Sequence, residues 1–342
     1  RDFSTPLAHS AAMPRKINFL LRTLNVAQAA KFTGLYLFEP YDEKRIPVVF
    51  VHGLMSDMRT WGQMLNTLLH DPEIRRKYQF LGFAYSSGNP ILVSGETLRR
   101  ELVALRAKLV EKKCSTEAFD KMVLVGHSMG GLLSRLQITE CSPEEMKNIF
   151  RIKDAEAIRR KLDPEALQKM EHLITFRPCS FIRRVIFIAV PHRGSEIARS
   201  WIGTLGSYMI ELPVEIVRMN VTLIRDLVKS GKLQWKGVTF FTGIDNLRPD
   251  APVLQLLNGL KMAESVPCHS IIGNRQSAFT PGGTDGVVPY WSSHLDHVES
   301  ELIVHASHSA HRVPLAIQEV RRILLKHATQ KSPSASVKKT GD

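Results

Sequence analysis

Hydrophobic residues along this chain fall into two kinds of segment. Residues 47–51 and 184–190 are short, almost continuous apolar runs, which is typical of strands buried on both faces of a parallel sheet. Further strands are predicted from similar runs at residues 34–38, 78–85, 122–125, 237–242, 268–273 and 301–304.

Other apolar residues recur every three or four positions and predict amphipathic helices. Leu98, Leu102, Leu105 and Leu109 mark the apolar face of one long helix, and residues 17–30 and 314–327 show the same spacing. Thr60, with Gln63 three positions later, has the pattern of a helix-capping pair. Strands and helices that alternate in this way predict an α/β fold with a mostly parallel, doubly wound sheet, whose ligands bind at the carboxyl ends of the strands.

The same pattern divides the chain into three parts. Residues 1–46 are expected to wrap the surface, residues 47–327 to form the α/β domain, and the Lys/Ser-rich residues 328–342 to be a disordered basic tail. Charged, helix-prone residues at about 140–180 and a sparsely charged stretch at about 195–235 lack a strand pattern. We expect both to be lid-like helical insertions above the carboxyl ends of the strands.

Composition narrows the class of protein. The chain has 342 residues, of which 44% are hydrophobic and 23% charged, so a substantial core is expected. No apolar run approaches the roughly 20 residues that span a bilayer. Lys and Arg number 46 against 33 Asp and Glu, which gives a net charge of +13. The basic residues are spread along the chain, which argues against nucleic acid as a partner. An anionic membrane surface is the hypothesis that the charge leaves.

Three further features of the sequence bear on setting and metal binding. The chain begins at Arg1; a removed leader would place the protein in the cell envelope or outside the cell, and otherwise we expect a cytoplasmic protein. The four cysteines lack metal-binding spacing, so no metal site is predicted, and disulfide pairing and oligomeric state stay open. His294, Asp296 and His297 are polar neighbours that we interpret as a solvated loop rather than a cation site.

The most informative stretch is residues 122–136, where an apolar strand runs into Gly126-His127-Ser128-Met129-Gly130-Gly131 and a helical pattern follows. Gly126 and Gly130 have no Cβ, so a strand and a helix can approach closely around a sharp turn with Ser128 at its apex. This strand–turn–helix arrangement predicts that Ser128 is a nucleophile.

A nucleophilic serine needs a base, and the base needs an acid that fixes its tautomer. Asp285 lies in a glycine-rich loop after a late predicted strand, and His308 and His311 follow the last strand directly. That order, serine, then acid, then histidine, is the order expected for this kind of turn. The order alone leaves His308 and His311 as alternatives for the base.

These motifs together resemble the α/β-hydrolase superfamily, specifically its lipases and esterases and the GPI-inositol-deacylase-like serine esterases. The matching residues are His52-Gly53-Leu54, 126–131, 191–195, 284–289 and 307–311. The resemblance implies an α/β-hydrolase fold, favours His308 as the base over His311, and implies an oxyanion hole made by the backbone N–H groups of Leu54 and Met129. His52, His127 and His192 are then expected to be structural.

We therefore interpret the chain as a serine carboxylester hydrolase that forms an acyl-enzyme on Ser128 and needs no cofactor. An apolar segment at residues 201–210 indicates an ester or lipid-like substrate, although a plain core helix explains it equally well. Two alternatives stay open: an acyltransferase or amidase that uses the same three residues, and a non-catalytic binding protein on the same fold.

Overall fold

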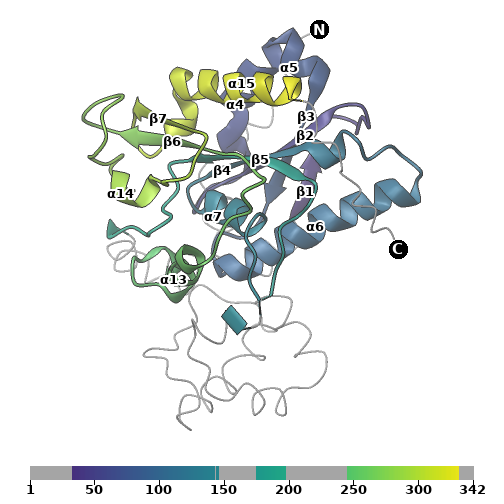
Figure 1. Cartoon of the computed structure of the whole chain (residues 1–342). Coiled ribbons are helices and arrows are strands. Elements are labelled where there is room, and N and C mark those ends of the chain that lie inside the picture. The colour runs from purple at the N-terminus through teal and green to yellow at the C-terminus, as the bar shows by residue number, and fades with distance from the viewer. Residues whose placement is uncertain (1–32, 143, 146–174, 198–244, 331–342) are drawn as a thin grey trace, which may run out of the picture.

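The computed structural model describes residues 33–142, 144–145, 175–197 and 245–330. Their centre is a seven-stranded sheet in the order β1-β3-β2-β4-β5-β6-β7 (Figure 1). Every neighbouring pair is parallel except β1 and β3, which are antiparallel. The strands are β1 (Gly34–Leu37), β2 (Ile46–Val51), β3 (Tyr78–Ala84), β4 (Met122–His127), β5 (Ile182–Ile188), β6 (Cys268–Asn274) and β7 (Ser300–His305).

Helices cover both faces of the sheet (Figure 1). One face carries α4 (Gly62–His70), α5 (Pro72–Lys77) and α15 (Pro314–Thr329), and the other carries α6 (Ile91–Glu111), α7 (Met129–Leu136) and α13 (Pro252–Gly259). The shorter elements are η1 (Met58–Trp61), η2 (Phe119–Lys121), η3 (Asp245–Leu247), α14 (Tyr290–Ser293) and η4 (Ala310–Arg312).

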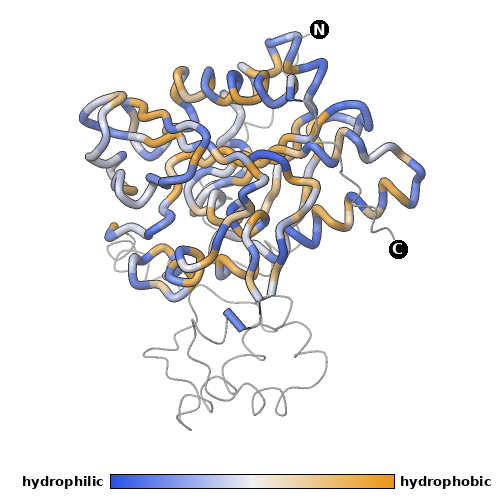
Figure 2. Tube along the Cα trace, in the orientation of Figure 1, coloured by the Kyte–Doolittle hydropathy of each residue, from blue (hydrophilic) through white to orange (hydrophobic). Residues whose placement is uncertain are grey.

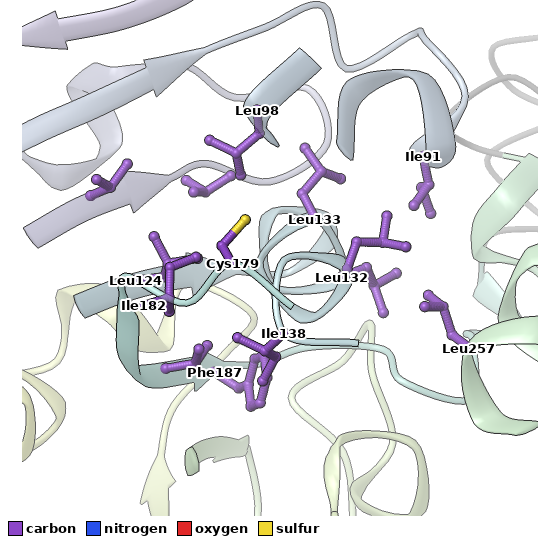
Figure 3. Close-up of a cluster of buried hydrophobic side chains, with 14 of the residues drawn as sticks. Ile91, Leu98, Leu124, Leu132, Leu133, Ile138, Cys179, Ile182, Phe187 and Leu257 are labelled. Carbon is purple, nitrogen blue, oxygen red and sulfur yellow. The ribbon is translucent and has the colours of Figure 1, made fainter. Parts of the chain in front are cut away.

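The alternation of side chains along each strand divides the interior into two hydrophobic cores. In β2, Val48 and Phe50 belong to the core under α4, α5 and α15, whereas Val49 and Val51 belong to the core under α6, α7 and α13. A central strand of a two-sided sheet must therefore be apolar at every position. Figure 2 shows apolar residues concentrated along these strands and alternating with polar residues in the helices. Figure 3 shows Leu98 of α6 and Leu132 and Leu133 of α7 in the second of these cores.

The structure confirms the predicted α/β architecture and corrects several of its boundaries. β1 is an edge strand of the sheet, so the sheet begins before residue 47. α15 continues to Thr329, into the predicted tail. Thr60 does not cap a helix; Asp57 is the residue whose side chain caps η1, by accepting the N–H of Arg59.

Some predictions concern residues outside the described part of the chain: the helix at 17–30, the strand at 237–242, the apolar segment at 201–210, and most of both insertions. The two ends of the first insertion are described, and they meet: Cys141 and Phe176 form an antiparallel bridge. No helix of the described ranges combines the length and the apolar character needed to cross a lipid bilayer.

Candidate active site

Ser128 occupies the sharp turn between β4 and α7. Its backbone has φ 53° and ψ −128°, a conformation that costs a residue with a Cβ of the order of 1–3 kcal/mol. Two backbone hydrogen bonds hold it there: the N–H of Ser128 donates to the carbonyl of Ile188 at 2.9 Å, and the N–H of Gly131 donates to the carbonyl of Ser128 at 2.9 Å. The surrounding sheet thus fixes a strained turn at the carboxyl end of β4.

The glycines on either side of Ser128 are required by close backbone contacts. A Cβ at Gly130 would lie 2.2 Å from the carbonyl oxygen of Val51 and 2.3 Å from that of His52. A Cβ at Gly126 would lie 2.5 Å from the Cα of Gly131. No side chain fits at such distances, so the sharp turn around Ser128 can form only with glycine at these positions.

The structure brings Ser128, His308 and Asp285 together in one line of hydrogen bonds. Nε2 of His308 lies 2.9 Å from Oγ of Ser128, and Nδ1 of His308 lies 2.7 Å from Oδ2 of Asp285. Because an ionised carboxylate can only accept, Nδ1 carries the proton and Nε2 is free to accept the hydroxyl proton. This is the arrangement that a general base needs beside a nucleophile.

Asp285 is itself held in place by its own loop. Its Oδ1 accepts the N–H groups of Val287 and Val288, both at 2.7 Å, and its side chain is 1% exposed. One carboxylate oxygen therefore anchors the residue while the other faces His308. The loop follows β6, and the segment with His308 follows β7, as the chain order predicted.

His311, the alternative base in the sequence, lies elsewhere. Its Nε2 is 2.7 Å from Oγ1 of Thr60, and Nη2 of Arg312 donates to the same hydroxyl at 3.3 Å. Burial lowers the pKa of His311 to about 3. The structure therefore places His308, and not His311, between Ser128 and Asp285.

The histidines expected to be structural are buried. Burial lowers the pKa of His52 to about 4 and holds the pKa values of His127 and His192 well below the ordinary range. The ring of His52 stacks on that of Tyr85 at 4.4 Å, and the Tyr85 hydroxyl donates to the carbonyl of His52 at 2.7 Å. Near neutral pH these imidazoles are uncharged.

The two groups predicted for the oxyanion hole lie on segments that border Ser128. Met129 is the first residue of α7, so its N–H has no carbonyl four residues earlier within the helix. Leu54 follows Gly53, and a Cβ at Gly53 would lie only 2.9 Å from Cβ of Ser128. The loop after β2 therefore passes directly against the serine.

In the polar cluster around His294, both ring nitrogens of the histidine lie close to carboxylate oxygens. Nδ1 of His294 lies 2.6 Å from Oε2 of Glu301, and Nε2 lies 3.3 Å from Oδ1 of Asp296. Within the described ranges, no group of three or more His, Cys, Asp or Glu side chains is placed to hold a metal ion. Cys114, Cys141, Cys179 and Cys268 are all free thiols.

The contact between Thr60 and His311 was missed in the sequence. These residues are 251 positions apart, and nothing local to either one signals the pairing. The sequence around Thr60 predicts a different role, because a threonine ahead of a helical pattern is typical of a helix cap.

Comparisons with known proteins bear on the same region. Residues 42–153 match the family model of the PGAP1-like alpha/beta domain, a stretch that contains β2, β3, β4 and the turn with Ser128. A search of curated proteins finds no match.

Several solved structures are similar to the chain. The mature lipase BlEst2 of Bacillus licheniformis has a TM-score of 0.46 at 15% identity, with 85% of this chain and 97% of that chain covered. Staphylococcus hyicus lipase has a TM-score of 0.46 at 12% identity, covering 84% and 97%. A carboxylesterase structure from the thaumarchaeon Nitrososphaera gargenis has a TM-score of 0.41 at 11% identity, covering 86% and 95%.

Proposed function

We propose that this protein is a serine hydrolase of the α/β-hydrolase superfamily and that it cleaves carboxylic ester bonds. The observation that carries the proposal is the line of hydrogen bonds from Asp285 through His308 to Ser128, at 2.7 and 2.9 Å. That line ends on a serine held in a strained turn at the start of a helix. Each part has a role in acyl transfer.

In the proposed mechanism, Oγ of Ser128 attacks the carbonyl carbon of the ester as Nε2 of His308 takes the hydroxyl proton. The resulting imidazolium is stabilised by Asp285, whose carboxylate receives the Nδ1–H. The negative charge that develops on the carbonyl oxygen is directed at the N–H groups of Met129 and Leu54. His308 then gives its proton to the leaving alcohol, which leaves an acyl group on Ser128.

Water then completes the reaction, and His308 again acts first as a base and then as an acid. His308 takes a proton from water, the hydroxide attacks the acyl carbon, and Ser128 leaves with the proton returned from His308. All of these steps use side chains and backbone groups of this chain. An alcohol or amine acceptor would take the acyl group from the same acyl-enzyme, and an amide substrate would form that acyl-enzyme with an amine as the leaving group. Acyl transfer and amide cleavage therefore remain the alternatives within this mechanism.

The alternative of a non-catalytic binding protein is less favoured by the geometry. A binding protein has no need for Ser128 at a strained φ of 53°, or for an imidazole of His308 that is hydrogen-bonded to both Ser128 and Asp285. Strain of this kind is retained where it has a use. We propose an apolar or lipid-like ester as the substrate, on the basis of the apolar sequence of residues 201–210, and an anionic membrane surface as its setting, on the basis of the net charge of +13.

Labelling with a fluorophosphonate probe tests the proposal. The wild-type protein should be labelled and should hydrolyse p-nitrophenyl esters, and Ser128→Ala should lose both properties while its circular dichroism spectrum is unchanged. Ser134→Ala is a matched control from the same helix, because that hydroxyl only donates to the carbonyl of Gly130. Labelling or turnover retained in pure Ser128→Ala would refute the mechanism, and a series of acyl lengths would define the substrate class.

A further inference from the structure

His127 connects the serine turn to the segment that carries the base. Its Nε2 lies 2.8 Å from the backbone carbonyl oxygen of His308. Because a carbonyl only accepts, Nε2 of His127 must carry the proton, which fixes the tautomer of this imidazole. The residue before the nucleophile thus holds the backbone of the base, which lies 181 residues away in the sequence.

The same imidazole touches the other segments that shape the site. Its ring centre lies 5.0 Å from that of His308 and 4.2 Å from that of His311, and it meets the ring of Trp61 edge to face at 6.4 Å. A Cβ at Gly53 would lie 3.1 Å from Nδ1 of His127. His127 therefore lies between the serine turn, the loop after β2 and the segment after β7.

A histidine is a costly choice at this position if packing alone is required. Nδ1 of His127 is buried and has no hydrogen-bond partner within the described ranges, and an unpaired buried polar atom costs about 1–3 kcal/mol. A phenyl ring would fill a similar volume without that cost. What a phenyl ring lacks is the Nε2–H that reaches the His308 carbonyl.

The charge state of His127 also fits a structural link rather than a second base. Burial, together with the neighbouring His311 and His308, holds the pKa of His127 well below its ordinary value. The imidazole therefore stays neutral while His308, 5.0 Å away between ring centres, becomes an imidazolium. It can hold the base without competing for the proton of Ser128.

We infer that His127 is a positioning residue whose Nε2–H fixes the backbone of His308, so that the imidazole of His308 stays within reach of Ser128. This inference rests on the proposed function. Nucleophile and base come from segments that follow different strands, and a displacement of about 1 Å between reacting groups can cost about 10²-fold in rate. One hydrogen bond from the neighbour of the nucleophile removes that freedom.

Two substitutions separate positioning from packing. His127→Phe keeps an aromatic ring and loses the donor, whereas the amide nitrogen of His127→Gln reaches about as far as Nε2 of histidine and keeps it. Positioning predicts that His127→Phe loses about 10–10²-fold in kcat with little change in KM, and that His127→Gln stays within about fivefold of wild type.

Thermal unfolding of the same variants provides the contrast. A phenyl ring removes the unpaired Nδ1 but leaves the carbonyl of His308 without its donor, so the two effects on the free energy of unfolding oppose each other. The loss of kcat in His127→Phe should therefore be larger than its change in stability accounts for. Activities that follow stability, equal losses in both variants, or a fully active His127→Phe would each overturn the inference.

Failure of the proposed function would look different from failure of this inference. If the wild-type protein shows no labelling or hydrolysis that depends on Ser128, the proposed function itself is wrong. If wild type is active and His127→Phe matches it in kcat, only the role of His127 is wrong.

Discussion

Nδ1 of His308 donates a hydrogen bond to Oδ2 of Asp285 at 2.7 Å, although the two residues follow different strands of the sheet. The second oxygen of Asp285 is taken up by two backbone N–H groups of its own loop. The carboxylate therefore cannot turn away from the imidazole without losing both of these bonds. Its position fixes which nitrogen of His308 carries the proton.

Asp285→Asn should test that relationship. We expect the fold to be kept and kcat to fall by about 10²–10⁴-fold, because an amide can present N–H to the imidazole and favour the wrong tautomer. Steady-state kinetics, with circular dichroism as a check of folding, measures the effect. Asp296→Asn is the control, since that carboxylate is 68% exposed; a silent Asp285→Asn beside a damaging Asp296→Asn would show that the acid is misassigned.

Gly130→Ala should be among the most damaging single-methyl additions in the chain. The new Cβ would meet the backbone oxygens of Val51 and His52 at 2.2 and 2.3 Å, and the end of a strand that is paired on both sides cannot move aside cheaply. We expect a loss of about 3 kcal/mol or more in the free energy of unfolding. Gly62→Ala is the matched control, because a Cβ there meets nothing within 4 Å and should be neutral or slightly stabilising; similar losses in denaturant unfolding of both variants would contradict this account.

The central strands could be predicted well from the sequence, because strands that are buried on both faces are apolar at almost every position. β2 packs on two cores, so each of Val48, Val49, Phe50 and Val51 had to be apolar. β1 was recognised as a strand but placed outside the domain. Its edge position leaves Tyr36 and Leu37 substantially exposed, so its pattern resembles that of a peripheral segment.

The site was harder to predict, because its contacts join residues far apart in the chain. The turn around Ser128 is local and has a recognisable pattern, whereas the choice between His308 and His311 depends on the fold of the segment after β7. There, η4 begins only at Ala310, so His308 precedes the helical turn and the two histidines do not share a face. That difference directs His308 to Ser128 and His311 to Thr60.

Stability should fall as the solution is acidified below neutral. Burial lowers the pKa of His327 from 6.5 to about 4, and its Nδ1 accepts a hydrogen bond from Nε of the buried Arg184 at 3.3 Å. Because the folded-state pKa is depressed, the unfolded chain binds the proton first. The stability that depends on neutral His327 is present above about pH 6.5 and is lost as the pH falls from there to about 4.

His327→Gln should reduce that dependence. One such histidine contributes a slope of up to about 1.4 kcal/mol per pH unit, and His269, whose pKa is also lowered to about 4 by burial, adds to the wild-type slope. Urea unfolding between pH 4.5 and 7.5 measures the difference between the variant and wild type. His70→Gln, at an exposed helix end, controls for the loss of a histidine as such; equal slopes for wild type and His327→Gln would rule out this source of acid sensitivity.

The two histidines after β7 should give opposite results when each is replaced by alanine. His308→Ala removes the group that lies 2.9 Å from Oγ of Ser128, and kcat/KM should fall by at least about 10³-fold, close to the loss from Ser128→Ala, because the members of a triad act as a unit.

His311→Ala removes a buried ring that bonds Thr60 and packs on His127 and Trp61. Its main effect should be on the midpoint of thermal unfolding, with a much smaller loss of kcat/KM that reflects the less firmly held segment. Kinetics and unfolding on both purified variants decide the matter. An inactive His311→Ala beside an active His308→Ala would move the base three residues along, whereas activity in both would mean that no histidine of this segment serves Ser128, and the serine hydrolase mechanism would fail.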